Sequence, residues 1–301
     1  MNENKTNINW YPGHMAKTKK QIVEDIKLVD LVIELLDARI PISSQNPDIS
    51  QFISNKKKII VLNKSDLADQ KETQKWINFF NEKNIPAIEV DSNQGKGINQ
   101  VLKIIEKTME DILKQESQKG RIRKTIRAMI VGIPNVGKSS FINRISNKSS
   151  LTVGNKPGVT KQKQWIRIGN QIELLDTPGV LWPKFESDEV ALNLAYIGSI
   201  KDEIIDKVEV CYHLIKFLEK NYREKLIEKY KITTEEIEQI KNHSQYIYEL
   251  MQLIGRKRGA IVSGGRIDDN KVANLVLDDF RSGKIGNITL EQCQKGRFFL
   301  T

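Results

Sequence analysis

The sequence predicts an α/β protein in which a mostly parallel, doubly wound sheet forms one domain and a smaller, mostly helical domain follows. Up to about residue 187, short apolar runs rich in β-branched residues alternate with stretches of helical spacing, as in the βα units of a parallel sheet. Beyond that point, apolar residues recur three and four positions apart, which favours helices alone. We therefore expect two domains, over residues 1–187 and 188–301.

Six short apolar runs are the expected strands, and the fourth leads directly into a glycine-rich loop. Only Gly169-Asn170 separates the last two runs, and such a dipeptide is typical of a two-residue hairpin turn. The sheet should therefore have one antiparallel edge. The expected strands cover residues 31–36, 58–62, 87–90, 126–131, 165–168 and 171–175.

Apolar residues at helical spacing predict helices between the strands and throughout the second domain. The basic or glycine-rich segments 255–259 and 263–265 are expected to interrupt the second domain as loops. The expected helices cover residues 73–83, 98–115 and 139–146 in the first domain, then 190–197, 204–230, 244–253 and 272–280, with another beginning near Thr234.

A phosphate-binding loop is predicted at Gly132-x4-Gly137-Lys138-Ser139, between a strand and the start of a helix. Glycines let backbone amides turn toward phosphate oxygens, and the helix N-terminus adds partial positive charge. Lys138 would contact the β- and γ-phosphates, and Ser139 would offer its hydroxyl to Mg²⁺. The residues expected around the phosphates are Asn135, Val136, Gly137, Lys138, Ser139 and Ser140.

A second segment, Asp176-Thr177-Pro178-Gly179, ends the expected hairpin. Asp176 would hold Mg²⁺ through water, and the backbone amide of Gly179 would meet the γ-phosphate. Thr160 lies in the loop between the phosphate-loop helix and the hairpin, and it is the candidate for a further Mg²⁺ ligand. The alternative is that Thr160 is an ordinary loop threonine.

The nucleotide base is specified by Asn63-Lys64-Ser65-Asp66, which follows the second expected strand. A carboxylate at Asp66 can accept hydrogen bonds from N1–H and N2–H₂ of guanine, whereas adenine would leave it unpaired. Lys64 would lie along the face of the base. Backbone amides at Ser92-Asn93 would read guanine O6, although this segment departs from the Ser-Ala-Lys common in GTPases. GTP and GDP are therefore the expected nucleotides.

The order of these segments is unusual, because the base-reading segment precedes both the phosphate loop and the switch segment at 176–179. In an ordinary GTPase the base-reading segment follows them. The first domain should therefore be a circularly permuted GTPase domain. The second domain should then be connected directly to the segment that senses the γ-phosphate.

The motifs leave open what completes a hydrolytic site. Val180 stands where Ras-like enzymes carry a water-orienting glutamine, and a valine cannot orient water. A polar group must come from elsewhere in the chain, from a partner, or from a monovalent cation. Asn135 resembles the asparagine that helps to bind K⁺ in several GTPases of this broad type, so K⁺ is a candidate cofactor beside Mg²⁺.

The charge of the chain points to a polyanionic partner. The net charge is +10 and the pI is near 9.3, and basic residues gather in clusters, which favours phosphate contacts. The alternative is a composition that is merely rich in lysine. The candidate RNA-binding residues are Lys17, Lys19, Lys20, Arg256, Lys257 and Arg258.

Membrane and secreted classes are not favoured. No run approaches the roughly 20 apolar residues of a spanning helix, and the polar start lacks the apolar core of a signal peptide. Cys211 and Cys293 are too few and too far apart to suggest a disulfide framework or a zinc site. We therefore expect a cytoplasmic protein with no membrane role.

The chain shows the permuted order together with the segments 10–17, 36–41, 132–139, 176–185, 257–259 and 263–265. In these features it closely resembles the ribosome biogenesis GTPase A family, also called YlqF, over nearly its whole length. The resemblance implies an assembly factor that binds the immature large (50S) ribosomal subunit late in maturation. It also implies a GTPase that is slow alone and is stimulated by that subunit.

The resemblance further implies roles for particular regions. In this family the histidine that corresponds to His14 has been proposed to act in hydrolysis; the alternative is that the segment 10–14 contacts RNA or a ribosomal protein, or packs the arm onto the domain. The second domain would contact ribosomal RNA, and the protein is expected to be monomeric off the ribosome. One rival function is a module in which the nucleotide is mainly a conformational ligand, and another is a switch that acts on the small subunit or on another structured RNA.

Overall fold

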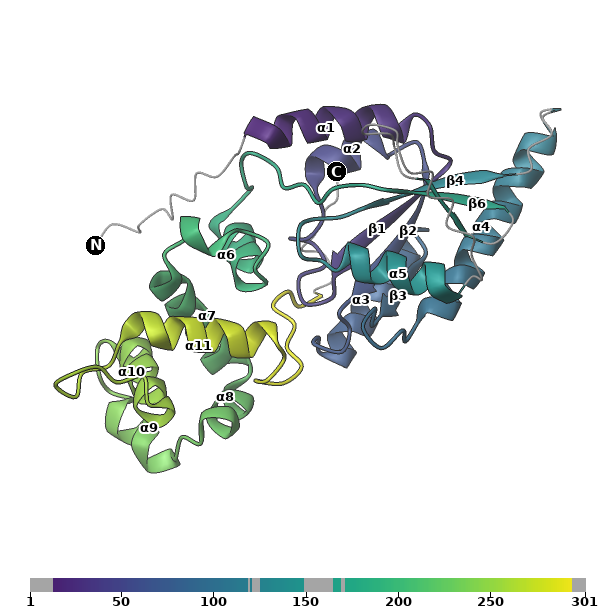
Figure 1. Cartoon of the computed structure of the whole chain (residues 1–301). Helices are drawn as coiled ribbons and strands as arrows, with labels where there is room; N and C mark the ends of the chain where they lie inside the picture. Colours follow the sequence, from purple (N-terminus) through teal and green to yellow (C-terminus); the bar gives the residue numbers. More distant parts are fainter. Residues whose placement is uncertain (1–12, 119, 121–124, 149–164, 169–170, 294–301) are drawn as a thin grey trace. The chain divides into compact units, whose positions relative to one another are not determined.

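The computed structural model describes residues 13–118, 120, 125–148, 165–168 and 171–293. These residues fall into two compact units. The sheet unit comprises the described parts of Trp10–Lys184 and Glu291–Thr301, and the helical unit comprises Phe185–Leu290 (Figure 1). The chain therefore returns to the sheet unit after it leaves the helical unit.

A six-stranded sheet organises the sheet unit, in the order β3-β2-β1-β4-β6-β5. Neighbouring strands are parallel except for β5 and β6, which are antiparallel, so the predicted antiparallel edge is confirmed. The turn predicted at Gly169-Asn170 lies outside the described residues. The strands are β1 Leu31–Asp37, β2 Lys57–Asn63, β3 Ala87–Val90, β4 Ile126–Val131, β5 Trp165–Ile168 and β6 Ile172–Asp176.

The register of the sheet brings the chemically important strand ends together. Asp37 is aligned with Asn63, and Asn63 is aligned with Val90, so β1, β2 and β3 end at the same edge. On the other side of β1, Ile130 of β4 is aligned with Asp176 of β6. From β1 the chain adds β2 and β3 on one side of the sheet and then adds β4 on the other side of β1. In doubly wound sheets, ligands bind at such a switch point, outside the carboxyl ends of the strands.

Helices cover both faces of this sheet. Figure 1 shows α1 and α2 on one side and α5 on the other. Buried residues of α1, α2, β1, β4 and β6 share one core cluster, while α4 packs against β2 and β3 and contacts α5. The helices are α1 Gly13–Ile26, α2 Pro47–Phe52, α3 Gln70–Glu82, α4 Ile98–Gln118 and α5 Lys138–Lys148.

Two of these helices are not among those that the sequence predicts. The buried anchors of α1 in its core cluster are Ile22 and Ile26, within a stretch of polar and lysine residues. Helix α2 has six residues and begins after Asn46, whose side chain accepts a hydrogen bond from the amide of Ile49. Both helices depend on tertiary packing more than on a repeated apolar pattern.

The helical unit corrects two expectations. The stretch 204–230 is not one helix, because α7 begins after the N-cap Asp206 and the chain bends at Tyr222 before α8. The segment 255–258 is not a loop but the last turn of α10. The elements are α6 Asp188–Tyr196, the 3₁₀ turn η1 Asp202–Ile204, α7 Lys207–Asn221, α8 Arg223–Tyr230, α9 Thr234–Ile240, α10 Tyr246–Arg258 and α11 Asp269–Arg281.

A close helix packing explains the glycine inside α10. A Cβ atom on Gly255 would lie 2.5 Å from Cγ2 of Ile267 and 2.7 Å from Cγ2 of Val272. The helix then ends at Gly259, whose φ of +68° suits the left-handed residue that terminates many helices. Across the described parts of both units, no helix has the length and the apolar character needed to cross a membrane.

Candidate functional site

A cavity of about 750 Å³ opens at the carboxyl ends of β2, β3, β4 and β6. All but one of the described residues that the sequence assigns to the phosphates, to Mg²⁺ or to guanine line this cavity. The exception is Val136, whose side chain is buried. Thr160 lies outside the described residues. The folded chain thus brings together three segments that are far apart in the sequence.

The phosphate loop is held close to the sheet by its glycines. A Cβ atom on Gly132 would lie 2.6 Å from the carbonyl oxygen of Leu35 in β1. Gly137, with φ +96°, lies so close to Asn63 that a Cβ atom would approach its Nδ2 to 2.4 Å. Asn135, between them, also has a positive φ of +59°. The loop therefore curves around the cavity in a conformation that larger residues at 132 and 137 would not permit.

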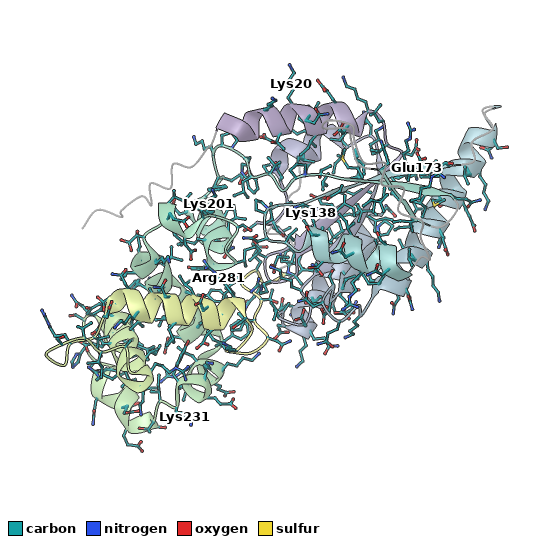
Figure 2. All side chains as sticks on the ribbon, viewed as in Figure 1. Lys20, Lys138, Glu173, Lys201, Lys231 and Arg281 are labelled. Carbon is teal, nitrogen blue, oxygen red and sulfur yellow. The ribbon has the colours of Figure 1, made fainter. Side chains whose placement is uncertain are left out.

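Lys138, the first residue of α5, lines the cavity (Figure 2). Its Nζ donates to the carbonyl oxygens of Gly132 and Ile133, at 3.1 and 3.0 Å. Burial lowers the pKa of Lys138 to about 8, and the nearby carboxylate of Asp176 opposes that shift. A phosphate group would favour the charged ammonium.

The switch segment is hydrogen-bonded to the strand beside it and lies close to the phosphate loop. The hydroxyl of Thr177 donates to the carbonyl oxygen of Ile130 at 2.6 Å. A Cβ atom on Gly179 would lie 2.7 Å from Nζ of Lys138 and 2.8 Å from the backbone nitrogen of Pro134. The segment therefore passes over the phosphate loop at a distance that requires glycine.

Asp176 and Ser139 are suitable ligands for Mg²⁺. Burial raises the pKa of Asp176, and the charge of Lys138 opposes this. Mg²⁺ in phosphate-loop sites uses few protein ligands and completes its shell with phosphate oxygens and water, so a hydroxyl and a carboxylate on one cavity fit it. The described residues contain no cluster of three or more His, Cys, Asp or Glu side chains that could hold a metal ion.

Val180 is a core residue. Its side chain is 3% exposed and belongs to the cluster that includes Ile22 and Ile26 of α1. Its carbonyl oxygen accepts a hydrogen bond from Nδ2 of Asn46 at 2.9 Å. The residue after Gly179 thus anchors the switch segment to α1 and to the loop before α2, and it is not among the residues that line the cavity.

His14 lies in the first turn of α1. Its side chain is not among those that the structure describes. Through α1, however, its backbone belongs to the element that packs beside Val180.

Asn63 joins the base-reading segment to the phosphate loop. Its Nδ2 donates to the carbonyl oxygen of Val136 at 2.8 Å, and its Oδ1 accepts from the amide and the hydroxyl of Ser92 at 3.2 and 2.7 Å. Because Asn63 is buried, these bonds fix three loops relative to one another.

Asp66 lies at the rim of the cavity. Burial is the largest cause that raises the pKa of Asp66, and the neighbouring carboxylate of Asp91 adds to it. The guanidinium of Arg39 acts in the opposite direction and favours the charged form. Asp66 needs its charge in order to accept both guanine donors.

The segment predicted to read guanine O6 is already hydrogen-bonded within the protein. The amide of Asn93 donates to Oδ1 of Asp91 at 2.8 Å, while that of Ser92 donates to Asn63. Arg144 of α5 donates to the carbonyl oxygens of Ser92 and Asn93. Reading O6 with these amides requires that they share or exchange these bonds.

Four residues around the cavity are not among the site residues that the sequence predicts. Asp37 and Arg144 bond to predicted residues from neighbouring elements, Asp91 accepts from the amide of Asn93 in its own segment, and Arg39 bonds to Asp37. Strand register and helix packing place all of them except Asp91. Asp37 and Arg39 did carry a signal, since they lie in the segment 36–41 that supports the family resemblance. The four residues are Asp37, Arg39, Asp91 and Arg144.

The predicted RNA-binding residues lie on two different units. Lys17 and Lys20 are exposed on α1, whereas Lys19 pairs with Asp48 at 2.5 Å. The other three occupy the exposed last turn of α10, where Lys257 pairs with Glu236 at 2.7 Å. The two groups are Lys17, Lys19 and Lys20, and Arg256, Lys257 and Arg258.

A phosphate loop before a helix, a base-reading segment and a switch segment surround one cavity, and the strands that carry them follow a rotated order along the chain. This combination defines a circularly permuted phosphate-loop GTPase. Comparison with known proteins agrees. The family model described as "50S ribosome-binding GTPase" matches residues 127–254.

Ribosome biogenesis GTPase A of Bacillus cereus is 44% identical over 94% of this chain and 93% of its own length. The protein of the same name from Priestia megaterium is 45% identical, over 94% of this chain and 96% of its own. The crystal structure of GNP-bound YlqF from T. maritima matches with a TM-score of 0.63 and 28% identity, over 92% of this chain and 98% of that one.

This chain belongs to the ribosome biogenesis GTPase A family, as its resemblance at the sequence level implied. Members of this family are GTPases, so the chain binds guanine nucleotide and hydrolyses GTP. Its binding partner is a ribosome-related particle or component.

Proposed function

We propose that this protein is a GTP-driven switch in the assembly of the large (50S) ribosomal subunit, acting in the cytoplasm late in maturation, and that the subunit stimulates its hydrolysis. The observation that carries the proposal is the meeting of base-reading, phosphate and switch segments around one cavity, with the helical unit beginning at Phe185, directly after the switch segment. The description of the matching family as ribosome-binding supports the choice of partner.

Within this function, one group of cavity residues binds the guanine base and another binds the phosphates. Asn63, Lys64, Asp66 and the Ser92-Asn93 segment form the guanine side, and the phosphate loop with Gly179 forms the phosphate side. Ser139, Asp176 through water, and Thr160 would hold Mg²⁺, which would supply positive charge beside the phosphate oxygens. K⁺ beside Asn135 would add charge near the phosphates, as an arginine finger does.

The group that completes hydrolysis is His14, at the start of α1. The burial of Val180 supports this assignment, because it removes the residue after Gly179 from the reaction while packing it against α1. In the presence of large-subunit particles, His14→Ala should lose most of the stimulated turnover but keep GTP binding. His243→Ala, an exposed histidine of the helical unit, is the matched control. Full stimulated turnover in His14→Ala would refute this role.

The basic residues of α1 and of the end of α10 provide the contacts with ribosomal RNA. Lysine and arginine contacts to phosphates give affinity with little reading of sequence. The exposure of Lys17, of Lys20 and of the three basic residues at the end of α10 supports this assignment.

Turnover of GTP alone, with large-subunit particles and with small-subunit particles tests the function. We expect stimulation by the large particles only, and none for Lys138→Ala. No stimulation by either particle would favour the module in which the nucleotide is a conformational ligand. Stimulation by the small particles alone would favour the other rival.

A further inference from the structure

A buried carboxylate lies beneath the base-reading segment. Asp37 ends β1, opposite Asn63 in the sheet, and its side chain is fully buried. Arg39 is 1% exposed and grips it: Nε donates to Oδ1 at 2.9 Å, Nη2 donates to Oδ2 at 2.8 Å, and the backbone amide donates to Oδ1 at 3.1 Å. Three donors from one residue leave this carboxylate little freedom to rotate.

The same carboxylate also holds the lysine of the base-reading segment. Nζ of Lys64 lies 3.2 Å from Oδ2 of Asp37. It also donates to the carbonyl oxygen of Asn135, in the phosphate loop, at 2.6 Å. The backbone of Lys64 has a φ of +58°, so the segment turns sharply at this residue. One ammonium therefore links the buried carboxylate to the loop that surrounds the phosphates.

The carboxylate of Asp37 keeps its charge in the folded protein. Burial raises the pKa of Asp37, but the charges of Arg39 and Lys64 outweigh it and hold the pKa well below its usual range. If the Asp37 ion pair only stabilised the fold, the guanidinium of Arg39 would be sufficient to neutralise the carboxylate. Here Oδ2 is shared with a residue that lines the cavity.

We propose that Asp37 and Arg39 are positioning residues for guanine-nucleotide binding, which act by holding the ammonium of Lys64 at the junction of the base-reading segment and the phosphate loop. This inference rests on the proposed guanine site. The pair presents the two loops to the nucleotide as one preorganised surface, so that less order has to be created on binding. The charge of Arg39 also lowers the pKa of Asp66, while the charge of Asp37 raises it, so the pair acts mainly through Lys64.

A positioning role makes a specific kinetic prediction. The hydrogen bonds and the ion pair described above join the pair to the base-reading segment and not to the γ-phosphate segment. Its loss should therefore weaken nucleotide binding and raise KM, while kcat at saturating GTP stays near that of the wild type. A residue needed only for folding would instead lower the amount of folded protein without changing KM.

The test is a double-mutant cycle between Asp37 and Lys64, read out as the affinity for a fluorescent GDP. Asp37→Asn should weaken binding on the order of tenfold, and the effect should disappear in a Lys64→Met background, which keeps the side-chain stem but not the charge. Equal weakening in both backgrounds, or no weakening in either, would overturn the proposal.

Two further variants keep the test decisive. Asp37→Asn strands the charge of Arg39, so the pair Asp37→Asn/Arg39→Gln removes both buried charges and preserves folding better. The same cycle is run on that pair. Asp202→Asn is the matched control, because Asp202 also accepts two hydrogen bonds from an arginine, Arg281, but in the helical unit. It should leave GDP affinity unchanged.

The outcomes also separate this proposal from the proposed function. If the wild-type protein binds GDP but the cycle shows no coupling, the positioning role fails and the guanine site stands. If the wild-type protein shows no preference for guanine over adenine nucleotides, the guanine site fails, and the positioning role fails with it.

Discussion

Gly137→Ala tests whether the phosphate loop and the base-reading segment are fitted to each other at atomic distance. The new Cβ would lie 2.4 Å from Nδ2 of Asn63, and φ at this position is +96°. Asn63 cannot simply move away, because its amide bonds to the carbonyl oxygen of Val136 and to the amide and hydroxyl of Ser92. Relief of the clash must displace one loop from the other.

The magnitude follows from two costs. An L-residue in a left-handed conformation costs roughly 1–2 kcal/mol, and overpacking a well-packed site costs typically about 1–3 kcal/mol. The backbone cost lowers the free energy of unfolding whatever the arrangement of the two loops. The overpacking cost is relieved only when the two loops move apart, so we expect it to weaken nucleotide binding. We expect GDP affinity to fall about 5- to 150-fold, which corresponds to about 1–3 kcal/mol.

The assay is GDP affinity by fluorescence titration, with folding stability measured in parallel by urea denaturation. Gly259→Ala is the control, because φ there is +68° and nothing lies within 4 Å of the new Cβ. It should lose stability by the backbone cost alone and keep wild-type affinity. Wild-type affinity in Gly137→Ala would refute the reasoning, because it would mean that the loops do not need this approach.

Three other outcomes follow from the structure. Burial and the charge of Asp91 raise the pKa of Asp66, so on acidification GDP affinity should begin to fall at a higher pH than for an ordinary aspartate; titrations from pH 7 downward check this, and an unchanged affinity through the range where Asp66 protonates would contradict it. Gly179→Ala puts a Cβ 2.8 Å from the backbone nitrogen of Pro134, so it should weaken GTP more than GDP, and equal weakening in a competition assay would count against a γ-phosphate contact. Glu291→Gln weakens charge-assisted hydrogen bonds to a buried loop, so unfolding free energy in urea should fall by about 1–3 kcal/mol, and an unshifted midpoint would contradict this.

Local patterns predicted much of the sheet unit. The strand bounds agree within one residue at every end, because buried strands are short apolar runs whose composition differs sharply from that of the flanking loops. The phosphate loop could also be predicted from local sequence. Gly137 is required by the positive φ of the loop, and Lys138 supplies a positive charge for the phosphates. The break at Tyr222 was not readable, because apolar spacing continues through it from α7 into α8.

The remainder of the site depends on long-range register. Asp37 and Lys64 are 27 positions apart, and they meet only because β1 and β2 are aligned so that Asp37 stands opposite Asn63. A single-residue slip would turn Asp37 to the other face of the sheet. The local composition around Arg39 does not predict that its guanidinium is buried.

The buried loop before α2 shows how the permuted order shapes the sheet unit. Its Asn46 binds the carbonyl oxygen of Val180, immediately after the switch segment. Its Ser43 amide and the neighbouring Ile42 amide donate to the carboxylate of Glu291, immediately after the helical unit ends. The two points where the chain leaves and re-enters the sheet unit are therefore bonded to one loop.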